Sequence, residues 1–240
     1  MESNEMQKER VETPEMSAVQ RVIGVFTSPA KTFASIAVKP SWLLPIIIYS
    51  VVNIVFIFFA REIIVSETLT QQEERMVERG MESGQIEQAL STTENVMKYT
   101  MPIFGVIVPI ILILLVSAVF LFVGNVIMGG KASFKSIFSA TAHSFLIGSL
   151  GALIMLPLIL AKDTMQVSFS LASLMSEEAR KTFLYQLLLK VDIFWIWWIA
   201  VYSIGLAMIY KMKTQKMATA VVTVYAIYAV IASALSGLFS

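Results

Sequence analysis

The sequence predicts an all-α polytopic membrane protein: a bundle of five transmembrane helices with an N-terminal interfacial amphipathic segment and helical extracytoplasmic loops. First, 57% of the 240 residues are apolar and only 15% are charged, whereas soluble proteins have about 45–50% and 25%. Second, the apolar residues form five blocks of about 19 to 27 residues, each long enough to cross roughly 30 Å of hydrocarbon as a helix. These solid blocks differ from the periodic pattern of a soluble core. Lipid is therefore the solvent for most of this surface.

The five blocks lie in a single predicted membrane domain, residues 17–240. The predicted spans are residues 42–60, 102–128, 134–160, 191–210 and 217–239. The connections at 129–133 and 211–216 are so short that the helices they join must be antiparallel neighbours. The longer connections, 61–101 and 161–190, are the predicted outer loops. Residues 1–16 are polar and acid-rich, and we expect them to form a disordered cytoplasmic tail.

The placement of basic residues predicts the orientation. With the N-terminus inside, the inner segments hold ten basic and five acidic residues, whereas the outer segments hold eight basic and 12 acidic residues. This bias predicts a cytoplasmic N-terminus and an extracytoplasmic C-terminus in the inner (cytoplasmic) membrane of a cell. The net charge of +1 carries no information about an acidic partner, and no nucleic-acid partner is expected.

Segment 17–40 is expected to form two short amphipathic helices before the first span. Its apolar residues recur at helical spacing: Val19, Val22, Ile23, Phe26, Phe33, Ile36 and Ala37. Ser28 is a good N-cap and Pro29 fits the first helical position, so a second helix begins there. The basic residues on or near the polar side are Arg21, Lys31 and Lys39. This pattern favours helices in the inner headgroup region, and the alternative is a solvated linker.

Both outer loops are expected to contain helices. In loop 61–101, Thr70 and Glu73 fit a capping box that would start a small helical cap. An apolar stripe runs from there towards the second span: Ile86, Ala89, Leu90, Thr93, Val96 and Met97. In loop 161–190, Ser176 is the predicted N-cap of a surface helix. The apolar face of that helix would contain Phe183, Leu184, Leu187 and Leu188.

A ridge of small residues marks the third span at strict four-residue spacing: Ser136, Ala140, Ser144, Gly148 and Ala152. Small side chains let helix backbones approach closely, and in lipid close packing drives association. The ridge therefore predicts either the centre of the bundle or a face for a second copy of the chain or another protein.

Three polar side chains are predicted within the membrane: Asn53, Asn125 and His143. The two amides are expected to hydrogen-bond within the bundle, with a ligand contact as the alternative. His143 is the only histidine, so it has no partner pattern for metal binding or acid–base work. It is expected just inside the membrane.

Prolines and aromatic residues modify the predicted spans. Pro45, Pro102, Pro109 and Pro157 fall in the first three spans, where interior prolines kink helices and a kink can open a cavity. At the start of the fourth span, one acid stands beside three tryptophans: Asp192, Trp195, Trp197 and Trp198. This cluster is typical of an aromatic belt at a membrane boundary, with one charged anchor.

Catalytic patterns are absent from the sequence. No Asp, Glu, Lys or Arg lies centrally in a predicted span, which disfavours an ion-coupled transporter. The chain has no P-loop, no HExxH and no GxSxG motif, which disfavours ATP hydrolysis, zinc proteolysis and serine hydrolysis. Cysteine is absent, so thiol nucleophiles and zinc–thiolate sites are excluded. We expect no enzyme activity and no cofactor.

Three short stretches resemble the bacterial branch of the Yip family, the Ypt/Rab-interacting membrane proteins. They are TSPAKTF at 27–33, GGKASFKSIFSATAHSFLIG at 129–148 and GLAMIYKMKTQKMATAVV at 205–222. The resemblance implies a five-span fold with a cytoplasmic N-terminus and no catalytic activity. Eukaryotic relatives bind small GTPases and each other, but their DLxGP motif is missing here, which argues against GTPase binding. Some bacterial relatives accompany ABC-type exporters.

These observations favour a non-enzymatic membrane scaffold or adaptor that binds another membrane protein, with an ABC-type exporter as one candidate. The alternative is a passive channel or carrier for a lipid or small solute, which the prolines and long spans would suit. A lipid-directed enzyme is the least favoured class. Expected partners are membrane lipids, another membrane protein and a second copy of the chain.

Overall fold

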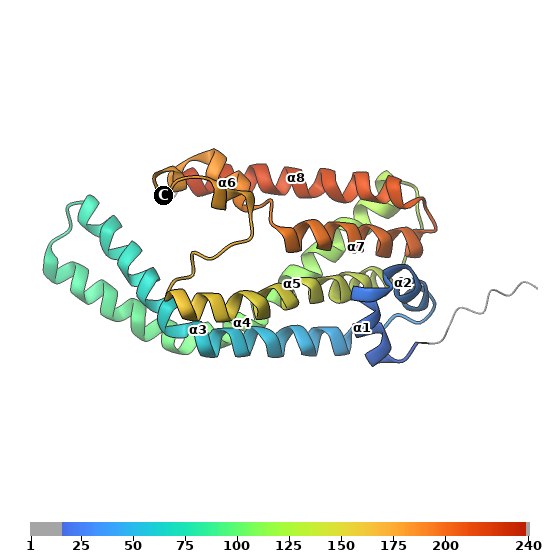
Figure 1. Ribbon diagram of the computed structural model, residues 1–240, viewed down its shortest axis with the longest axis horizontal. Coiled ribbons are helices and arrows are strands. Elements are labelled where there is room, and N and C mark those ends of the chain that lie inside the picture. Colours follow the sequence, from blue (N-terminus) through green and yellow to red (C-terminus); the bar gives the residue numbers. More distant parts are fainter. Residues whose placement is uncertain (1–15, 239–240) are drawn as a thin grey trace, which may run out of the picture.

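Five long helices run side by side in the computed structural model, which describes residues 16–238 (Figure 1). They are α3 (Leu43–Glu78), α4 (Ser83–Phe122, continued by the π-helical turn η1, Val123–Ile127), α5 (Phe134–Lys162), α7 (Ile193–Tyr210) and α8 (Thr214–Leu238). Each is long and apolar enough to cross a membrane. The predicted class, an all-helical bundle of five membrane-spanning helices, is confirmed. The predicted tail at 1–16 lies outside the described residues except for Met16.

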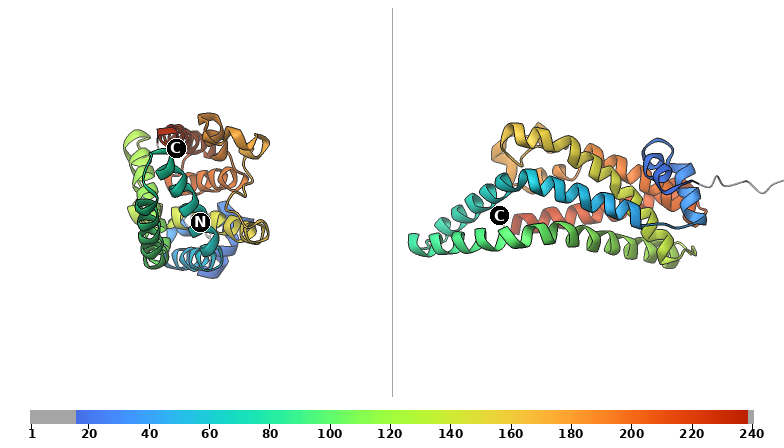
Figure 2. Two further views of the ribbon diagram at one scale, coloured as in Figure 1. Left: turned by 90° about the vertical axis from the view of Figure 1, so that its left-hand side faces the viewer. Right: turned by 90° about the horizontal axis from the view of Figure 1, so that it is seen from below.

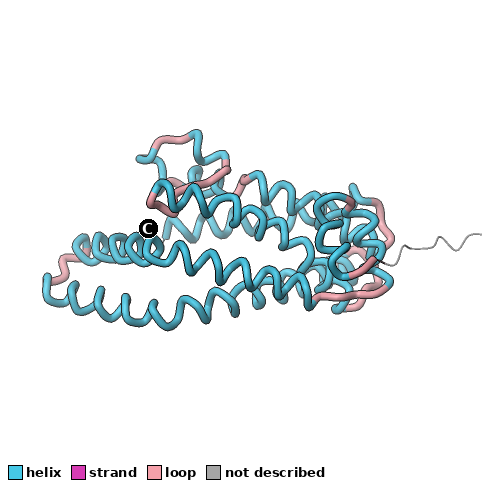
Figure 3. The backbone as a smooth tube through the Cα atoms, turned by 60° about the horizontal axis from the view of Figure 1, so that its bottom comes forward, coloured by secondary structure: helices cyan, strands magenta, loops and turns pink. Residues whose placement is uncertain are grey.

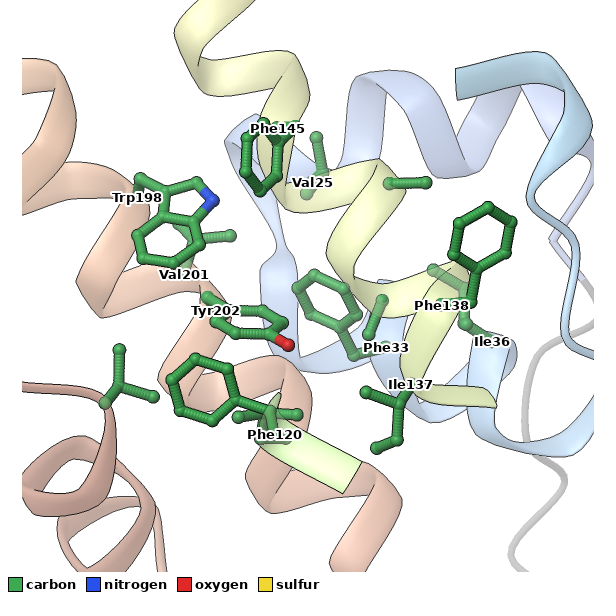
Figure 4. Close-up of a cluster of buried hydrophobic side chains, with 14 of the residues drawn as sticks. Val25, Phe33, Ile36, Phe120, Ile137, Phe138, Phe145, Trp198, Val201 and Tyr202 are labelled. Carbon is green, nitrogen blue, oxygen red and sulfur yellow. The ribbon is translucent and has the colours of Figure 1, made fainter. Parts of the chain in front are cut away.

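Helices α5 and α7 form the centre of the bundle. In their most apolar stretches 44% of residues are buried, against 17% in α3, α4 and α8. Figure 4 shows part of this core, in which Phe145 of α5 lies beside Trp198 of α7. The Thr141 hydroxyl of α5 lies 2.9 Å from the Tyr202 hydroxyl, so a hydrogen bond joins the two helices inside this core.

The outward faces of α3, α4 and α8 are apolar and exposed. On α4 alone, large side chains at about half exposure include Ile103, Phe104, Val108, Ile111 and Leu115. In water such a continuous apolar surface would drive aggregation, whereas lipid tails solvate it without cost.

Two short helices, α1 (Ala18–Thr27) and α2 (Pro29–Val38), cover one end of the bundle. We call it the α1–α2 end; Figure 2 shows this pair packed across the other helices. Ser17 caps α1 through a capping box with Gln20. Ser28 stands at the N-cap of α2 with Pro29 next to it, as predicted, although the Ser28 side chain makes no capping hydrogen bond.

The helix pair is packed into the bundle and does not lie apart from it. Phe33 and Ile36 of α2 are fully buried, and the Phe33 ring lies against α7 at Gly205, where an added Cβ would be 3.0 Å from the ring. The Phe26 ring of α1 contacts the Trp197 ring with 5.9 Å between centroids.

Arg21 corrects one detail of the sequence reading. It was expected on or near the polar side of the first helix, but it is only 4% exposed. Its guanidinium donates to the carbonyl oxygens of Lys39 (2.7 Å) and Ser35 (3.3 Å) and to the hydroxyls of Ser41 and Ser35. Both carbonyls lie at the C-terminal end of α2, where a cation is stabilised; the Ser35 oxygen also accepts from the Lys39 N–H at 3.1 Å.

The first outer segment is not a separate helical cap. Helices α3 and α4 continue through it as an antiparallel hairpin and meet at residues 79–82 (Figures 1 and 3). The predicted capping box is wrong, because Thr70 lies inside α3. Residues 61–78 contain neither Gly nor Pro and are rich in Glu, Gln and Arg, so the helix propagates. It ends where Gly80 adopts a φ of 73°, a conformation that favours glycine.

The second outer segment is mostly irregular. It contains the short 3₁₀ turns η2 (Leu171–Leu174) and η3 (Glu177–Lys181), followed by α6 (Phe183–Leu189). Ser176 precedes η3 and makes no capping hydrogen bond, so the predicted start of the α-helix is wrong. Thr182 is the cap of α6, because its hydroxyl accepts from the Tyr185 N–H at 3.2 Å.

The prolines differ in their positions. Pro102 and Pro109 lie inside α4 and Pro157 lies inside α5, as predicted. Pro45 is the third residue of α3, where a missing N–H breaks no helical hydrogen bond. It therefore does not lie in the interior of its span.

Candidate functional site

The small-residue ridge of α5 divides into two halves in the structure. Ala140 and Ser144 are fully buried inside the bundle, and Ser136 is half-buried near the start of α5, beside the capping residue Ser133. Gly148 is exposed and Ala152 is half-buried, and both line a groove. The first half therefore packs within this chain, and only the second half faces a space that another molecule could enter.

The three predicted polar residues are spread along the bundle and do not meet. Asn53 donates to the Tyr49 carbonyl oxygen of its own helix at 2.8 Å. Asn125, in η1, exchanges two 3.0 Å hydrogen bonds with the backbone of Ala132 and so closes the connection between α4 and α5. The buried His143 places its Nδ1 2.8 Å from the Ser139 carbonyl oxygen.

His143 also lines a cavity of about 410 Å³ near the α1–α2 end. Its other walls are Ala18, Lys135 and the chain from Pro40 to Pro45. Among residues 16–238 no group of three or more His, Cys, Asp and Glu side chains could hold a metal ion. Two of the residues that line this cavity are titratable, His143 and Lys135.

A groove of about 380 Å³ lies between α3, α5, α7 and the second outer segment. Gly148 forms part of its floor, since an added Cβ there would meet no atom within 4 Å. One turn on, Gly151 allows Phe194 to lie against α5, because an added Cβ would be 2.8 Å from the Phe194 ring. The two glycines act differently: one leaves the space open and the other brings α7 close.

Aromatic rings form one wall of the groove. Phe145 makes edge-to-face contacts with Tyr49 (centroids 5.9 Å apart) and Trp198 (5.6 Å). Trp195 contacts Trp198 in the same way at 5.6 Å. Edge-to-face pairs are the preferred aromatic geometry, so the wall is stable as well as apolar. The predicted belt residues Trp195 and Trp198 therefore line the groove, whereas Trp197 packs against Phe26.

Asp192 brings one carboxylate to this groove. Its Oδ1 accepts from the Phe194 N–H at 2.8 Å, which makes it the N-cap of α7. An isolated antiparallel β-bridge pairs Asp192 with Ser170. The Tyr225 hydroxyl of α8 donates to the nearby Lys190 carbonyl oxygen at 2.7 Å. Asp192 is 9% exposed and lies at the N-terminal end of α7.

Sequence reasoning found only part of this groove. Asp192, Trp195 and Trp198 stand together in the chain and were assigned to a membrane boundary, and Gly148 was assigned to the ridge. Tyr49 and Phe145 were missed, since each is a single aromatic residue within an apolar span. Only the packing of α3 and α5 against α7 brings them to the same wall.

The sequence matches one known family. The family model of the Yip1 domain matches residues 23–236, which include the groove and the α3–α4 hairpin. No curated protein and no solved structure matches the chain. Proteins of this family are generally non-enzymatic and act in membrane trafficking. The match confirms the predicted family, and the chain belongs to the Yip1 family of multi-span membrane proteins.

Proposed function

We propose that this protein is a non-enzymatic scaffold or adaptor that binds another membrane protein through the projecting part of the α3–α4 hairpin, residues 61–101. We call this part the docking arm. The single observation that carries the proposal is its length. Helix α3 has 36 residues and is about 54 Å long, whereas the hydrocarbon of a bilayer is roughly 30 Å thick. The arm therefore extends into the aqueous phase.

The docking arm is a two-helix unit that is hydrogen-bonded at its base. Ile86 is 8% exposed, and Met76, Ala89 and Met97 are half-buried in the seam between the helices. At its base, the Glu67 carboxylate accepts from the Thr164 hydroxyl at 2.6 Å and from the Met165 N–H at 2.9 Å. Because the arm is already helical, a partner that docks on it would have few further residues to order.

The outward face of the arm indicates the chemistry of its partner. Residues 61–101 contain eight acidic and four basic side chains, and exposed apolar residues stand among them, namely Val77 (60% exposed), Val96 (53%) and Tyr99 (69%). A basic surface with apolar pockets on the aqueous part of another membrane protein would complement this face. An ABC-type exporter is one candidate.

Charge supports an orientation for this proposal. At the α1–α2 end, the described parts of the predicted inner segments carry eight basic and no acidic residues, the last three being Lys211, Lys213 and Lys216. We infer that this end faces the cytoplasm and that the docking arm is extracytoplasmic. We further assign the chain to the bacterial branch of its family and to the cytoplasmic membrane of a bacterium. The alternative, a passive carrier for a lipid or small solute, is favoured by one observation, the groove beside α5.

Site-specific photo-crosslinking in cells of the native host tests the docking arm. A photoreactive amino acid at Tyr99 or Val96 should give a discrete adduct with a different membrane protein. The matched control is Val108, which is 52% exposed on the same helix but within the predicted span; it should give lipid adducts or none. An adduct at twice the monomer mass, or no adduct from either arm position, would overturn the adaptor role.

A further inference from the structure

We propose that the groove between α3, α5 and α7 binds an amphipathic ammonium compound, with the cationic group at Asp192 and the apolar tail along α5. The ethanolamine head of a phospholipid and a free long-chain amine share this chemistry. The site is separate from the docking arm, so its failure would leave the adaptor proposal untouched.

The first argument is space. The groove holds about 380 Å³, which lies within the usual range of small-molecule sites, roughly 300–1,000 Å³. Its floor at Gly148 is open, with no atom within 4 Å of the place where a side chain would begin. Beyond this floor the lining is flexible and apolar, with Phe56, Met155, Ile159 and Met165. A tail would remain in apolar surroundings along that side.

The second argument is charge. Asp192 lines the groove, and its Oδ1 is engaged by the Phe194 N–H. No ion pair joins Asp192 to a Lys or Arg side chain within the described range 16–238. A 9% exposed carboxylate without a cation is costly. A ligand that brings a positive charge would be stabilised there, and a ligand that brings a negative charge would be repelled.

The third argument is the aromatic wall. Tyr49, Phe145, Phe194, Trp195 and Trp198 line the same groove as Asp192. Aromatic faces attract cations, and a set of such rings is the usual surround of an ammonium group. A purely apolar ligand would form no ionic interaction with the carboxylate, and an anionic ligand would form no cation–π interaction with the rings. The two features together select a cation.

The fourth argument is the indole N–H of Trp198, a hydrogen-bond donor without an acceptor in the described part of the chain. Trp198 is 5% exposed, and its indole Nε1 has no hydrogen-bond partner among the residues that the structure describes. Figure 4 shows this nitrogen on the side of Phe145, another residue of the groove wall. A buried indole N–H normally has an acceptor. A phosphate or ester oxygen a few bonds from the ammonium would supply one.

The position of the site along the membrane normal also fits an amphipathic ligand. Helix α7 has 18 residues between Asp192 and Lys211, a length of about 27 Å. With Lys211 at one polar boundary, Asp192 comes near the opposite boundary of a hydrocarbon layer roughly 30 Å thick. A ligand there can place its charged group at Asp192 while its tail stays among lipid chains.

Native mass spectrometry of the full-length protein, delipidated in mild detergent, tests the proposal. Equimolar phosphatidylethanolamine and phosphatidylglycerol are the lipid probes, and dodecylamine and dodecanoic acid are the free probes. We expect phosphatidylethanolamine to be retained about tenfold more than phosphatidylglycerol, and dodecylamine to compete with it. Retention of dodecylamine alone would identify a free amine as the ligand. Equal retention of the ammonium and anionic probes would overturn the site.

Two variants separate binding from folding. Asp192→Asn keeps a good N-cap for α7 but removes the charge, and it should abolish the preference for ammonium probes. Gly148→Leu fills the groove and should abolish retention. The matched control is Gly84→Leu, at the start of α4, where an added Cβ also meets nothing within 4 Å; retention should be unchanged. Unaltered binding in both groove variants would contradict the proposal even if one of them proved unstable.

Discussion

The two ends of the bundle differ in the partners of their buried charged side chains. At the α1–α2 end, a buried arginine satisfies the carbonyl oxygens that end α2, and the helix pair fills the space against α5 and α7. At the hairpin end, a buried aspartate faces a groove, and α3 and α4 continue beyond the other helices. The helix pair packs over the α1–α2 end and leaves the cavity beside His143, whereas the hairpin end presents the groove and the projecting α3–α4 hairpin. Both of our binding proposals therefore concern the hairpin end.

The largest expected effect on stability is at the α1–α2 end. Arg21→Ala should lower the free energy of unfolding by about 2–4 kcal/mol, because it leaves buried acceptors at the end of α2 without donors. Thermal unfolding in detergent, followed by circular dichroism, would measure it. Lys31→Ala on the exposed side of α2 is the control and should change stability by less than about 0.5 kcal/mol. Equal effects of the two variants would contradict the role given to Arg21.

A smaller effect is expected at the hairpin end. Glu67→Ala removes the acceptor of the Thr164 and Met165 donors and should weaken the base of the docking arm by about 1–3 kcal/mol. Hydrogen exchange should rise in residues 61–101 while the centre of α5 and α7 stays protected. Glu74→Ala, an exposed acid on the same helix, should leave exchange unchanged. A uniform increase over the whole chain would mean that the two ends are not independent.

The smallest effect compares one glycine from each region. Gly205→Ala should destabilise the protein by about 1 kcal/mol, since the new Cβ would be 3.0 Å from the packed Phe33 ring. Gly148→Ala should be neutral or stabilising by up to about 1 kcal/mol, because the position is open and alanine favours helix. The melting temperatures of the two variants, measured in the same detergent, test this difference. The opposite order would mean that the groove is closed in the folded protein.

The span count could be predicted from the sequence because block length alone reports it. The short connections at 129–133 and 211–216 likewise determine antiparallel pairs. The predictions that failed concern segments whose structure depends on the helix that precedes them. Residues 61–78 look like a loop because they are polar, yet they are strong helix formers that follow an existing helix. A threonine and a glutamate three residues apart signal a helix start only where no helix already runs.

The candidate site was only partly predictable, because it depends on how separate spans pack. Gly148 and Ala140 belong to the same spacing pattern, but one faces a groove and the other is fully buried. Spacing identifies a helix face and does not say what covers it. Arg21 illustrates the same limit: periodicity placed it on or near a polar side, and only the fold of α2 around it explains its burial.

The shortness of α7 has a consequence for the surrounding bilayer. At about 27 Å the helix is slightly shorter than an average hydrocarbon layer of roughly 30 Å, whereas its neighbours are longer. Bilayer thickness that matches one helix therefore mismatches the next, at a cost of fractions of a kcal/mol per Å. Lipid near α7 must thin, or the bundle must tilt. The protein would then be sensitive to membrane thickness, and thinner bilayers would place Asp192 nearest to the lipid headgroups.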